Sequence, residues 1–228
     1  MYYPFEWRAH SHKQQAQVVN NIYYTQQQQQ QQQAQVCNEI QWVSRNEWAG
    51  RPPRQPAKTL PLPVGHAFIH HTVSPLNCLN HSSCIQAVKW AQNLHMDGNG
   101  WDDIGYNFLL GGDHRIYIAR GWSAQGSHTL GMNDRSINLA FIGNYDLEWP
   151  TAGMLEMAQK WLKCSLAMGI LTPDYQLHGH RDQSCLFSSP GQHVYDLIKQ
   201  WPHFLGGPLP TSKCYKSNIT TTTTSSSH

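Results

Sequence analysis

An α/β fold is predicted for this chain: a central mixed β-sheet flanked by helices, formed by a single domain. Short apolar runs typical of buried strands alternate with longer segments in which apolar residues recur at helical spacing. The length of 228 residues fits one ordinary domain with tails. The run at 137–143 is among the longest apolar runs and is far shorter than the roughly 20 residues of a membrane-spanning helix, so no transmembrane span is expected.

The elements expected within the domain follow in chain order. Ser44 and Glu47 have the spacing of a capping box, which predicts a short helix that Pro52 and Pro53 end. Strands are predicted at 67–71, 107–110, 115–119, 138–142 and 175–178. Longer helices are predicted at 82–96, 151–168 and 190–201.

The two ends of the chain differ from this pattern. An unbroken glutamine tract fills 26–33, and such a polar segment cannot bury enough apolar surface to offset the entropy of ordering it. A Thr/Ser run fills 220–227. We therefore expect a disordered glutamine-rich segment at 1–36, the domain at 37–215 and a disordered tail at 216–228.

The charge balance excludes some partners. Charged residues are 13% of the chain, about half the ~25% of an ordinary globular protein, and the formal net charge is +2. A nucleic-acid binder needs a dense basic face, so nucleic acid is not an expected partner. The surplus lies in 14 histidines, 9 tryptophans and 10 tyrosines. This composition indicates recognition by hydrogen bonds and ring faces.

The signals for the cellular compartment conflict. Six cysteines, with Asn-x-Ser/Thr acceptor patterns at Asn80 and Asn218, suit an oxidising and glycosylating compartment and predict an extracellular or secreted glycoprotein. The first residues lack the features of a secretory signal. An intracellular form is the alternative.

Two predicted strands end in histidines, at 70–71 and 178–180. Neighbouring residues of a strand point to opposite faces, so at most one of each local pair should join a given site unless the strand has already broken. His70 and His180 could then converge at one end of the sheet. With a thiolate or carboxylate and a water they would form a catalytic zinc site, but histidines that cap polar strand ends are the commoner outcome.

A third zinc ligand decides between these interpretations. Cys185 follows His180 by five residues, and Ser188 and Ser189 come next. A serine hydroxyl is a poor zinc ligand beside a thiolate. If Cys185 is disulfide-bonded, the two histidines alone would bind zinc weakly.

Five sequence motifs together resemble one known family. They are 69–75 (IHHTVSP), 95–108 (HMDGNGWDDIGYNF), 133–137 (NDRSI), 140–144 (AFIGN) and 189–191 (SPG). These motifs are similar to those of the peptidoglycan recognition proteins of animal innate immunity, whose fold is shared with phage-type N-acetylmuramoyl-L-alanine amidases. The resemblance covers about 42–204 and implies a domain of the amidase, or peptidoglycan-recognition, type.

The resemblance implies roles at the centre of the site. The family's zinc histidines fall on His70 and His180, and its catalytic tyrosine falls on Tyr106. The third zinc ligand of active members, a cysteine before Pro-Gly, is replaced by Ser189, or by Ser188 if the alignment shifts by one residue. Such a chain is expected to bind peptidoglycan without hydrolysis and without a cofactor. The alternative is a zinc-dependent amidase that cuts the lactyl–L-alanine bond with Tyr106 as its catalytic residue.

The same resemblance implies a ligand groove. Five hydrogen-bonding or ring-bearing positions match its lining: His71, His95, Tyr106, His128 and Asn133. Gly100, Trp101 and Arg120 match receptors for the meso-diaminopimelic-acid type of peptidoglycan. That residue carries one carboxylate more than lysine, and a guanidinium offers it a planar bidentate fork. A solvated surface arginine is the alternative interpretation of Arg120.

The family pattern also implies disulfides and partners. Cys78 pairs with Cys84 and Cys37 with Cys164 by the resemblance, and Cys185 and Cys214 remain as a possible third pair. The implied partners are bacterial peptidoglycan, its muramyl peptides and other peptidoglycan recognition proteins. A third hypothesis is a regulatory member that binds neither ligand nor metal well and acts through such protein contacts.

Overall fold

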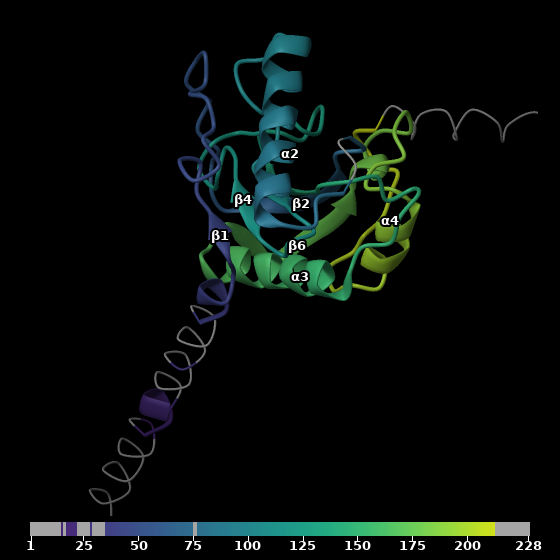
Figure 1. Ribbon diagram of the computed structural model, residues 1–228. Coiled ribbons are helices and arrows are strands. Elements are labelled where there is room, and N and C mark those ends of the chain that lie inside the picture. Colours follow the sequence, from purple (N-terminus) through teal and green to yellow (C-terminus); the bar gives the residue numbers. More distant parts are fainter. Residues whose placement is uncertain (1–14, 16, 22–27, 29–34, 75–76, 213–228) are drawn as a thin grey trace, which may run out of the picture.

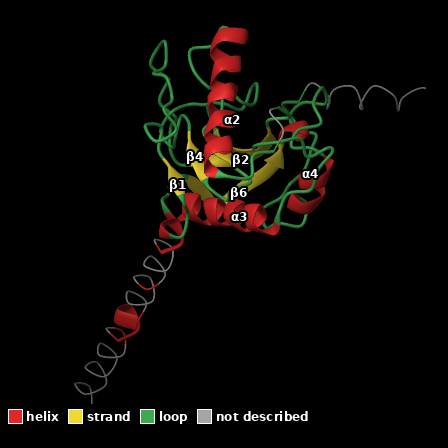
Figure 2. Ribbon diagram, in the orientation of Figure 1, coloured by secondary structure: helices red, strands yellow, loops and turns green. Residues whose placement is uncertain are grey.

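A six-stranded mixed β-sheet forms the centre of the molecule in the computed structural model (Figures 1 and 2). The structure describes residues 15, 17–21, 28, 35–74 and 77–212. The strands, in chain order, are β1 (Trp42–Val43), β2 (Val64–His71), β3 (Phe108–Leu110), β4 (Ile116–Ile118), β5 (Ser136–Phe141) and β6 (Leu171–Gly179). The strand order across the sheet is β1-β4-β3-β5-β2-β6. Only the β3–β4 pair is antiparallel among these paired strands.

Helices cover both faces of this sheet. The helical elements are α2 (His81–Asn93), the π-helical turn η1 (Leu94–Gly98), α3 (Ala152–Ala167), the 3₁₀ turn η2 (His180–Asp182) and α4 (Gln192–Ile198). In Figure 2 the yellow strands lie between α2 and α3, and α4 lies beside the end of β6. The predicted α/β class, with a mixed sheet between helices, is confirmed.

Alternation along the strands divides the core between the two helices. Phe108 and Leu110 pack with Trp161 of α3, whereas Leu109, between them, packs in the cluster that contains Val88 of α2. This is the period of two expected for a strand buried on both faces. Burying one such large apolar side chain stabilises the fold by roughly 1.5–3 kcal/mol.

The five predicted strands and the three long predicted helices are present, with ends shifted by a few residues. The short helix predicted from Ser44 is wrong, because residues 45–49 form turns, and the two-residue strand β1 was not predicted. The capping contacts do form: Ser44 N–H donates to Glu47 Oε2 at 2.7 Å. Ala49 then has φ 53°, a left-handed conformation that a right-handed helix cannot continue. Trp48 is thereby buried in the core.

The glutamine-rich segment is described only in part. Its described residues, 15, 17–21, 28 and 35–36, have helical backbone, and all but Val36 are exposed. The predicted disorder of the segment stays a prediction, because most of its residues lie outside those described. The tail at 216–228 lies outside the described residues, so the domain boundaries stay predictions. None of the helices within the described part of the chain has the length and hydropathy of a membrane span.

Both disulfides implied by the resemblance are confirmed. Cys37 and Cys164 join residues 127 positions apart and fix the segment before β1 to α3, and Cys78 and Cys84 close a short loop at the start of α2. Cys185 is also disulfide-bonded. Its predicted pairing with Cys214 involves a residue outside those described and stays a prediction. Such bonds are typical of proteins from oxidising compartments.

Candidate functional site

Parallel strand order brings the two histidine segments together. β2 and β6 are parallel neighbours, so their carboxyl ends reach the same edge of the sheet, where ligands of open α/β sheets commonly bind. His70 lies at the end of β2, and His180 follows β6 directly in η2. Their rings stack with centroids 4.3 Å apart. The predicted convergence of His70 and His180 is confirmed.

A π-helical turn brings a second set of rings to the same edge. After α2, the Asn99 N–H donates to the Leu94 carbonyl and the Trp101 N–H donates to the His95 carbonyl, both at 2.9 Å. These wider turns displace His95 from the regular helical register, a distortion that often occurs at functional sites. Gly100 follows with φ 71°, a conformation that glycine adopts without strain.

Six aromatic rings form a continuous row across the site. Successive ring centroids lie 4.3–5.8 Å apart, in the order Trp101, His95, Tyr106, His70, His180 and Phe187. All six residues line one groove of about 980 Å³. We call this series the ring row. It offers ring faces and edges along the groove, and its two ends differ in what surrounds them.

All eight residues predicted to bind ligand line this groove: His71, His95, Gly100, Trp101, Tyr106, Arg120, His128 and Asn133. His70 and His71 both line it, although alternation along a strand allows only one of them. Both residues are still paired with β5 at the end of β2, so the expectation that at most one of the two joins the site is wrong. His178 does not line the groove. It hydrogen-bonds His66 at 3.1 Å and contacts the ring of Phe68 further down the strands.

Burial keeps the groove histidines neutral at physiological pH. It lowers the pKa of His71, His95 and His180 to about 4 and that of His128 to about 3. The pKa of His70 is lowered well below its ordinary value, first by burial and then by the neighbouring histidines. The groove therefore presents uncharged imidazoles, which accept or donate hydrogen bonds according to tautomer.

Tyr106 lies at the middle of the ring row. Its ring packs edge-on against those of His70 and His95. Burial raises the pKa of the Tyr106 phenol to about 12, so the hydroxyl keeps its proton at neutral pH. It can act as a hydrogen-bond donor toward a bound carbonyl.

A threonine and an asparagine organise one wall of the groove. The buried Thr129 hydroxyl lies 3.1 Å from His70 Nε2 and 2.9 Å from His128 Nδ1. Asn133 Oδ1 accepts hydrogen bonds from the backbone N–H groups of His128 and Thr129. Asn133 therefore fixes this turn with its oxygen. Nε2 of both His71 and His128 is buried without a hydrogen-bond partner among the described residues.

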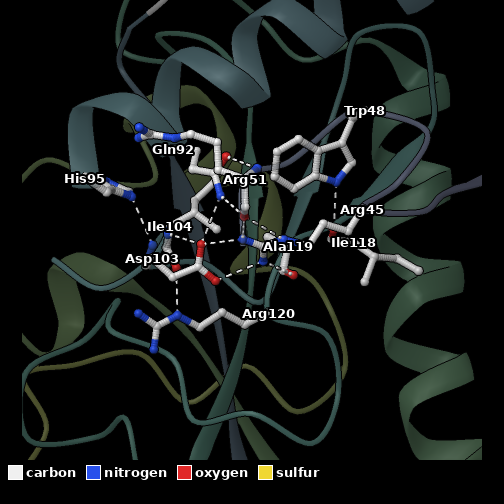
Figure 3. A network of polar contacts seen from close by, with 11 residues as sticks. Arg45, Trp48, Arg51, Gln92, His95, Asp103, Ile104, Ile118, Ala119 and Arg120 are labelled. Carbon is white, nitrogen blue, oxygen red and sulfur yellow. Dashed lines mark hydrogen bonds and ion pairs between the residues drawn. The ribbon is translucent and has the colours of Figure 1, made fainter. Parts of the chain in front are cut away.

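Arg120 also lines the groove and is held by backbone carbonyls. Its Nε donates to the Ile104 carbonyl at 2.7 Å (Figure 3). Its Nη1 donates to the Gln125 carbonyl, also at 2.7 Å. Nη2 makes no hydrogen bond to any residue that the structure describes. Burial lowers the pKa of Arg120, and the Asp103 carboxylate opposes that shift. The guanidinium is thus fixed, charged and able to donate further bonds.

One of the two serines predicted to replace the third zinc ligand lies in the groove. Ser189 lines the groove, and its Oγ accepts a hydrogen bond from the His71 N–H at 3.2 Å. Ser188 instead donates to the Asp146 carboxylate and does not line the groove. Cys185 is disulfide-bonded. Among the described residues no group of three or more His, Cys, Asp or Glu is arranged to hold a metal ion.

Some groove residues were not predicted. Thr129 and Phe187 line the groove without belonging to the sequence motifs, as do residues 55–58 from the segment before β2. Thr129 adjoins the predicted His128, which is a signal that could have indicated it. Phe187 lies in the stretch between His180 and Pro190 whose alignment to the family is uncertain by one residue. No local pattern predicts that residues 55–58 reach the groove.

Comparisons with known proteins agree with this geometry. Residues 60–192 match the family model Amidase_2, described as N-acetylmuramoyl-L-alanine amidase. Peptidoglycan recognition protein 1 of Bos indicus is 40% identical over 173 residues, which are 75% of this chain and 88% of that protein. The human N-acetylmuramoyl-L-alanine amidase is 40% identical over 168 residues, which are 73% of this chain but only 29% of that longer protein.

Solved structures agree as well. The complex of the ectodomains of peptidoglycan recognition proteins LCa and LCx with tracheal cytotoxin contains a chain that is 40% identical, with a TM-score of 0.71, covering 73% of this chain and 99% of that one. Peptidoglycan recognition protein LE, solved with tracheal cytotoxin, a monomeric diaminopimelic-acid-type peptidoglycan, is 36% identical with a TM-score of 0.69 and covers 72% and 95% of the two chains. The chain belongs to the peptidoglycan recognition protein family, within the Amidase_2 fold.

Proposed function

We propose that this protein is an innate-immune recognition protein that binds muramyl peptides of diaminopimelic-acid-type peptidoglycan and does not hydrolyse them. The observation that carries the proposal is the fixed Arg120 guanidinium at one side of a groove lined by neutral rings. The family's solved complex with a diaminopimelic-acid-type ligand supports the choice of ligand.

Most of the groove lining is uncharged, and its charged residues besides Arg120 are Lys58, Asp102 and Asp103. A muramyl peptide is mostly sugar and amide, which neutral imidazoles and a protonated tyrosine can hydrogen-bond without paired charges. The side-chain carboxylate of diaminopimelic acid is the group that lysine lacks at that position. Nη2 of Arg120 has no protein partner among the described residues, so it can donate to this carboxylate in a charge-assisted hydrogen bond.

The zinc site expected of an active family member does not fit these residues. A catalytic zinc needs three strong protein ligands and an open position. Here His70 Nε2 faces the Thr129 hydroxyl, and the third position is a serine hydroxyl that the His71 amide already engages. The disulfide at Cys185 withdraws that sulfur from any metal. This is why we propose binding without hydrolysis.

One observation favours the amidase alternative. The chain shares 40% identity with the human protein named N-acetylmuramoyl-L-alanine amidase, and Tyr106 lies between His70 and His95 where it could polarise a bound amide. In that reading zinc would occupy the space beside His70 and His180. The two hypotheses differ in a measurable product, because only the amidase would release free stem peptide.

A paired titration and a product assay test the proposal. The purified protein is titrated by calorimetry with two muramyl tripeptides that differ only in carrying diaminopimelic acid or lysine, and the same mixtures, with and without added zinc, are analysed by mass spectrometry. We expect tighter binding of the diaminopimelic ligand and intact ligands in every sample. Equal affinities would overturn the specificity, and release of free stem peptide would establish the amidase.

The proposed setting of this protein is outside the cell, where peptidoglycan fragments and disulfides both occur. Asn80 of the acceptor pattern is exposed, and its side-chain oxygen caps α2 by accepting the Ser83 N–H. Its amide nitrogen is not needed for that cap, so a glycan at this nitrogen is compatible with the helix. A loss of mass on enzymatic deglycosylation of secreted protein would support the glycan, and an unchanged mass would contradict it.

A further inference from the structure

A partly buried polar network connects Arg45, Asp103 and Arg120 (Figure 3). At its centre Arg45 makes a fork to Asp103, with Nη1 to Oδ2 at 2.9 Å and Nη2 to Oδ1 at 2.6 Å. Asp103 is 5% exposed. Removing one partner of such a pair leaves an unpaired buried charge, which is strongly unfavourable.

The ion pair fixes two backbone segments of the groove wall. Asp103 Oδ1 accepts the Ile104 N–H at 2.8 Å, and Arg45 Nη1 donates to the Ala119 carbonyl at 3.1 Å. Ala119 directly precedes Arg120. The fork therefore ties the backbone that carries Arg120 to the backbone that Arg120 contacts.

One peptide group then connects this network to two groove side chains. The peptide between Ile104 and Gly105 accepts Arg120 Nε at its carbonyl, at 2.7 Å, and donates its N–H to His95 Nδ1 at 2.9 Å. Because Nδ1 of His95 accepts a hydrogen bond, the neutral ring must carry its hydrogen on Nε2. The orientation of a single peptide plane thus sets both the aim of the guanidinium and the tautomer of the imidazole.

Glutamine and glycine residues hold this arrangement from either side. Gln92 Nε2 donates to Asp103 Oδ1 at 3.0 Å and its Oε1 accepts the Arg51 N–H at 2.9 Å, so the carboxylate is also anchored to α2. A Cβ on Gly105 would lie 2.6 Å from the Ser127 carbonyl oxygen. The peptide plane has little room to rotate while these contacts persist.

From these contacts we propose that Arg45 and Asp103 are positioning residues for ligand selectivity. Their ion pair fixes the orientation of the 104–105 peptide. That peptide in turn orients the Arg120 guanidinium and keeps the hydrogen of the His95 ring on Nε2. The inference rests on the proposed function, since selectivity is defined by the diaminopimelic and lysine ligands. Neither residue is expected to touch the ligand through its charged group. Arg45 does not line the groove. Asp103 does line it, but its carboxylate oxygens already accept hydrogen bonds from Arg45, Gln92 and the Ile104 N–H.

The test uses Arg45→Met, which keeps the length of the side chain and removes the fork, with Arg45→Lys as the conservative variant. Asp97→Asn is the matched control, because Asp97 pairs with Arg51 and Arg54 at an exposed position outside the groove lining. The ratio of affinities for the two muramyl tripeptides is expected to fall about tenfold in Arg45→Met, a change of about 1.4 kcal/mol. The ratio for Arg45→Lys should lie between those of the wild type and Arg45→Met, and Asp97→Asn should keep the wild-type ratio. Equal loss of both affinities in Arg45→Met, or an unchanged ratio, would overturn the positioning role.

A measurement without ligand separates this inference from the proposed function. Nitrogen-15 NMR of the His95 ring should show the Nε2–H tautomer in the wild type and Asp97→Asn, and a mixture of tautomers in Arg45→Met. An Nδ1–H tautomer in the wild type, or an unchanged ring in a folded Arg45→Met protein, would overturn the inference. If Arg45→Met does not fold, Arg45→Lys and the wild-type spectrum still decide it. A wild type that binds both ligands equally would instead refute the proposed specificity, and the ring spectra would be unaffected.

Discussion

The two ends of the ring row are built differently. At the end near Trp101, the charged side chain of Arg120 is fixed by carbonyls, and behind it lies a buried ion pair. At the end near Phe187, the groove contains neutral histidines and the Ser189 hydroxyl, with no group of three metal ligands among the described residues. We call these the arginine end and the histidine end.

If the proposed function holds, this difference means that ligand binding and metal chemistry are separable in one groove. At the arginine end, the contacts join residues that are far apart in sequence. None of these contacts involves a zinc ligand at the other end. The histidine end keeps its ring stacking through His70 and His180 without a thiolate, because ring contacts need no metal. Under the proposed function, the groove would keep its shape with a serine at the third ligand position.

Acidification should affect both ends and produce the largest effect. Burial depresses the folded-state pKa of His71, His95 and His180 to about 4, against about 6.5 in the unfolded chain. Between these two pKa values the unfolded state binds more protons than the folded state. The stability that the buried neutral histidines contribute is therefore fully present above pH 6.5 and is lost as the pH falls toward 4. From pH 7.5 to pH 5 we expect the free energy of unfolding to fall by about 2 kcal/mol for each such ring.

Urea denaturation at the two pH values measures this loss. His95→Asn, at the arginine end, and His180→Asn, at the histidine end, should each reduce the difference between pH 7.5 and pH 5. If only one variant reduces the change in the free energy of unfolding between pH 7.5 and pH 5, burial depresses the histidine pKa at only one of the two ends. A pH-independent free energy of unfolding in the wild type would contradict the burial argument.

Gly105→Ala should damage the arginine end. The added Cβ would lie 2.6 Å from the Ser127 carbonyl oxygen and 2.8 Å from the Trp101 ring, so backbone must move. We expect a loss of about 3 kcal/mol in the free energy of unfolding, the upper range for overpacking. Gly65→Ala is the control, since its Cβ would meet nothing within 4 Å, and it should cost little. Similar denaturation midpoints for the two variants would show that the close contacts at Gly105 do not destabilise the fold when a Cβ is added.

Arg120→Ala should weaken binding of one ligand more than the other. Losing a charge-assisted hydrogen bond to the ligand carboxylate should weaken binding of the diaminopimelic tripeptide by about 2 kcal/mol, roughly 30-fold. Binding of the lysine tripeptide, measured by the same calorimetry, should change little. Equal weakening for both ligands would mean that Arg120 supports the groove wall and does not read the extra carboxylate.

Ser189→Cys tests the histidine end and has the smallest expected effect. A thiolate at this position, beside His70 and His180, would complete a three-ligand set, so zinc affinity should rise at least about tenfold, or 1.4 kcal/mol. Ser188→Cys is the matched control, because Ser188 faces Asp146 outside the groove lining. Competition with a chromogenic chelator measures both variants. A comparable gain for Ser188→Cys would mean that the third position was assigned to the wrong serine.

The sequence indicates the members of the site better than their contacts. Motif resemblance places His71, Tyr106 and Arg120 in one groove, and the strand pattern predicts the sheet that carries them. It does not indicate that Arg45 pairs with Asp103, because the two lie 58 positions apart and Arg45 falls in a segment with a helix-capping pattern. Long-range pairs of this kind depend on the folded sheet and leave no local periodicity.

Two local features explain the other differences. Apolar spacing over 82–96 predicts one helix, yet the last turn widens at Leu94, and a widened turn has the same apolar residues as a regular one. The capping pattern at Ser44 forms its contacts, but a helix also needs right-handed residues after them, which Ala49 does not supply. In both places the backbone conformation is determined by tertiary packing.

The hydroxyl of Thr129 has a consequence for how the groove responds to a ligand. It has one hydrogen and lies within hydrogen-bond distance of both His70 Nε2 and His128 Nδ1, with no other partner among the described residues. Satisfying that hydrogen requires one imidazole to accept it while the other donates, so the protonation patterns of the two rings are complementary. A ligand that donates to His128 Nε2 selects the form in which Nδ1 of that ring carries its hydrogen, and His70 must then hold its own hydrogen on Nδ1. The tautomers of the two rings are thereby coupled through a single hydroxyl group.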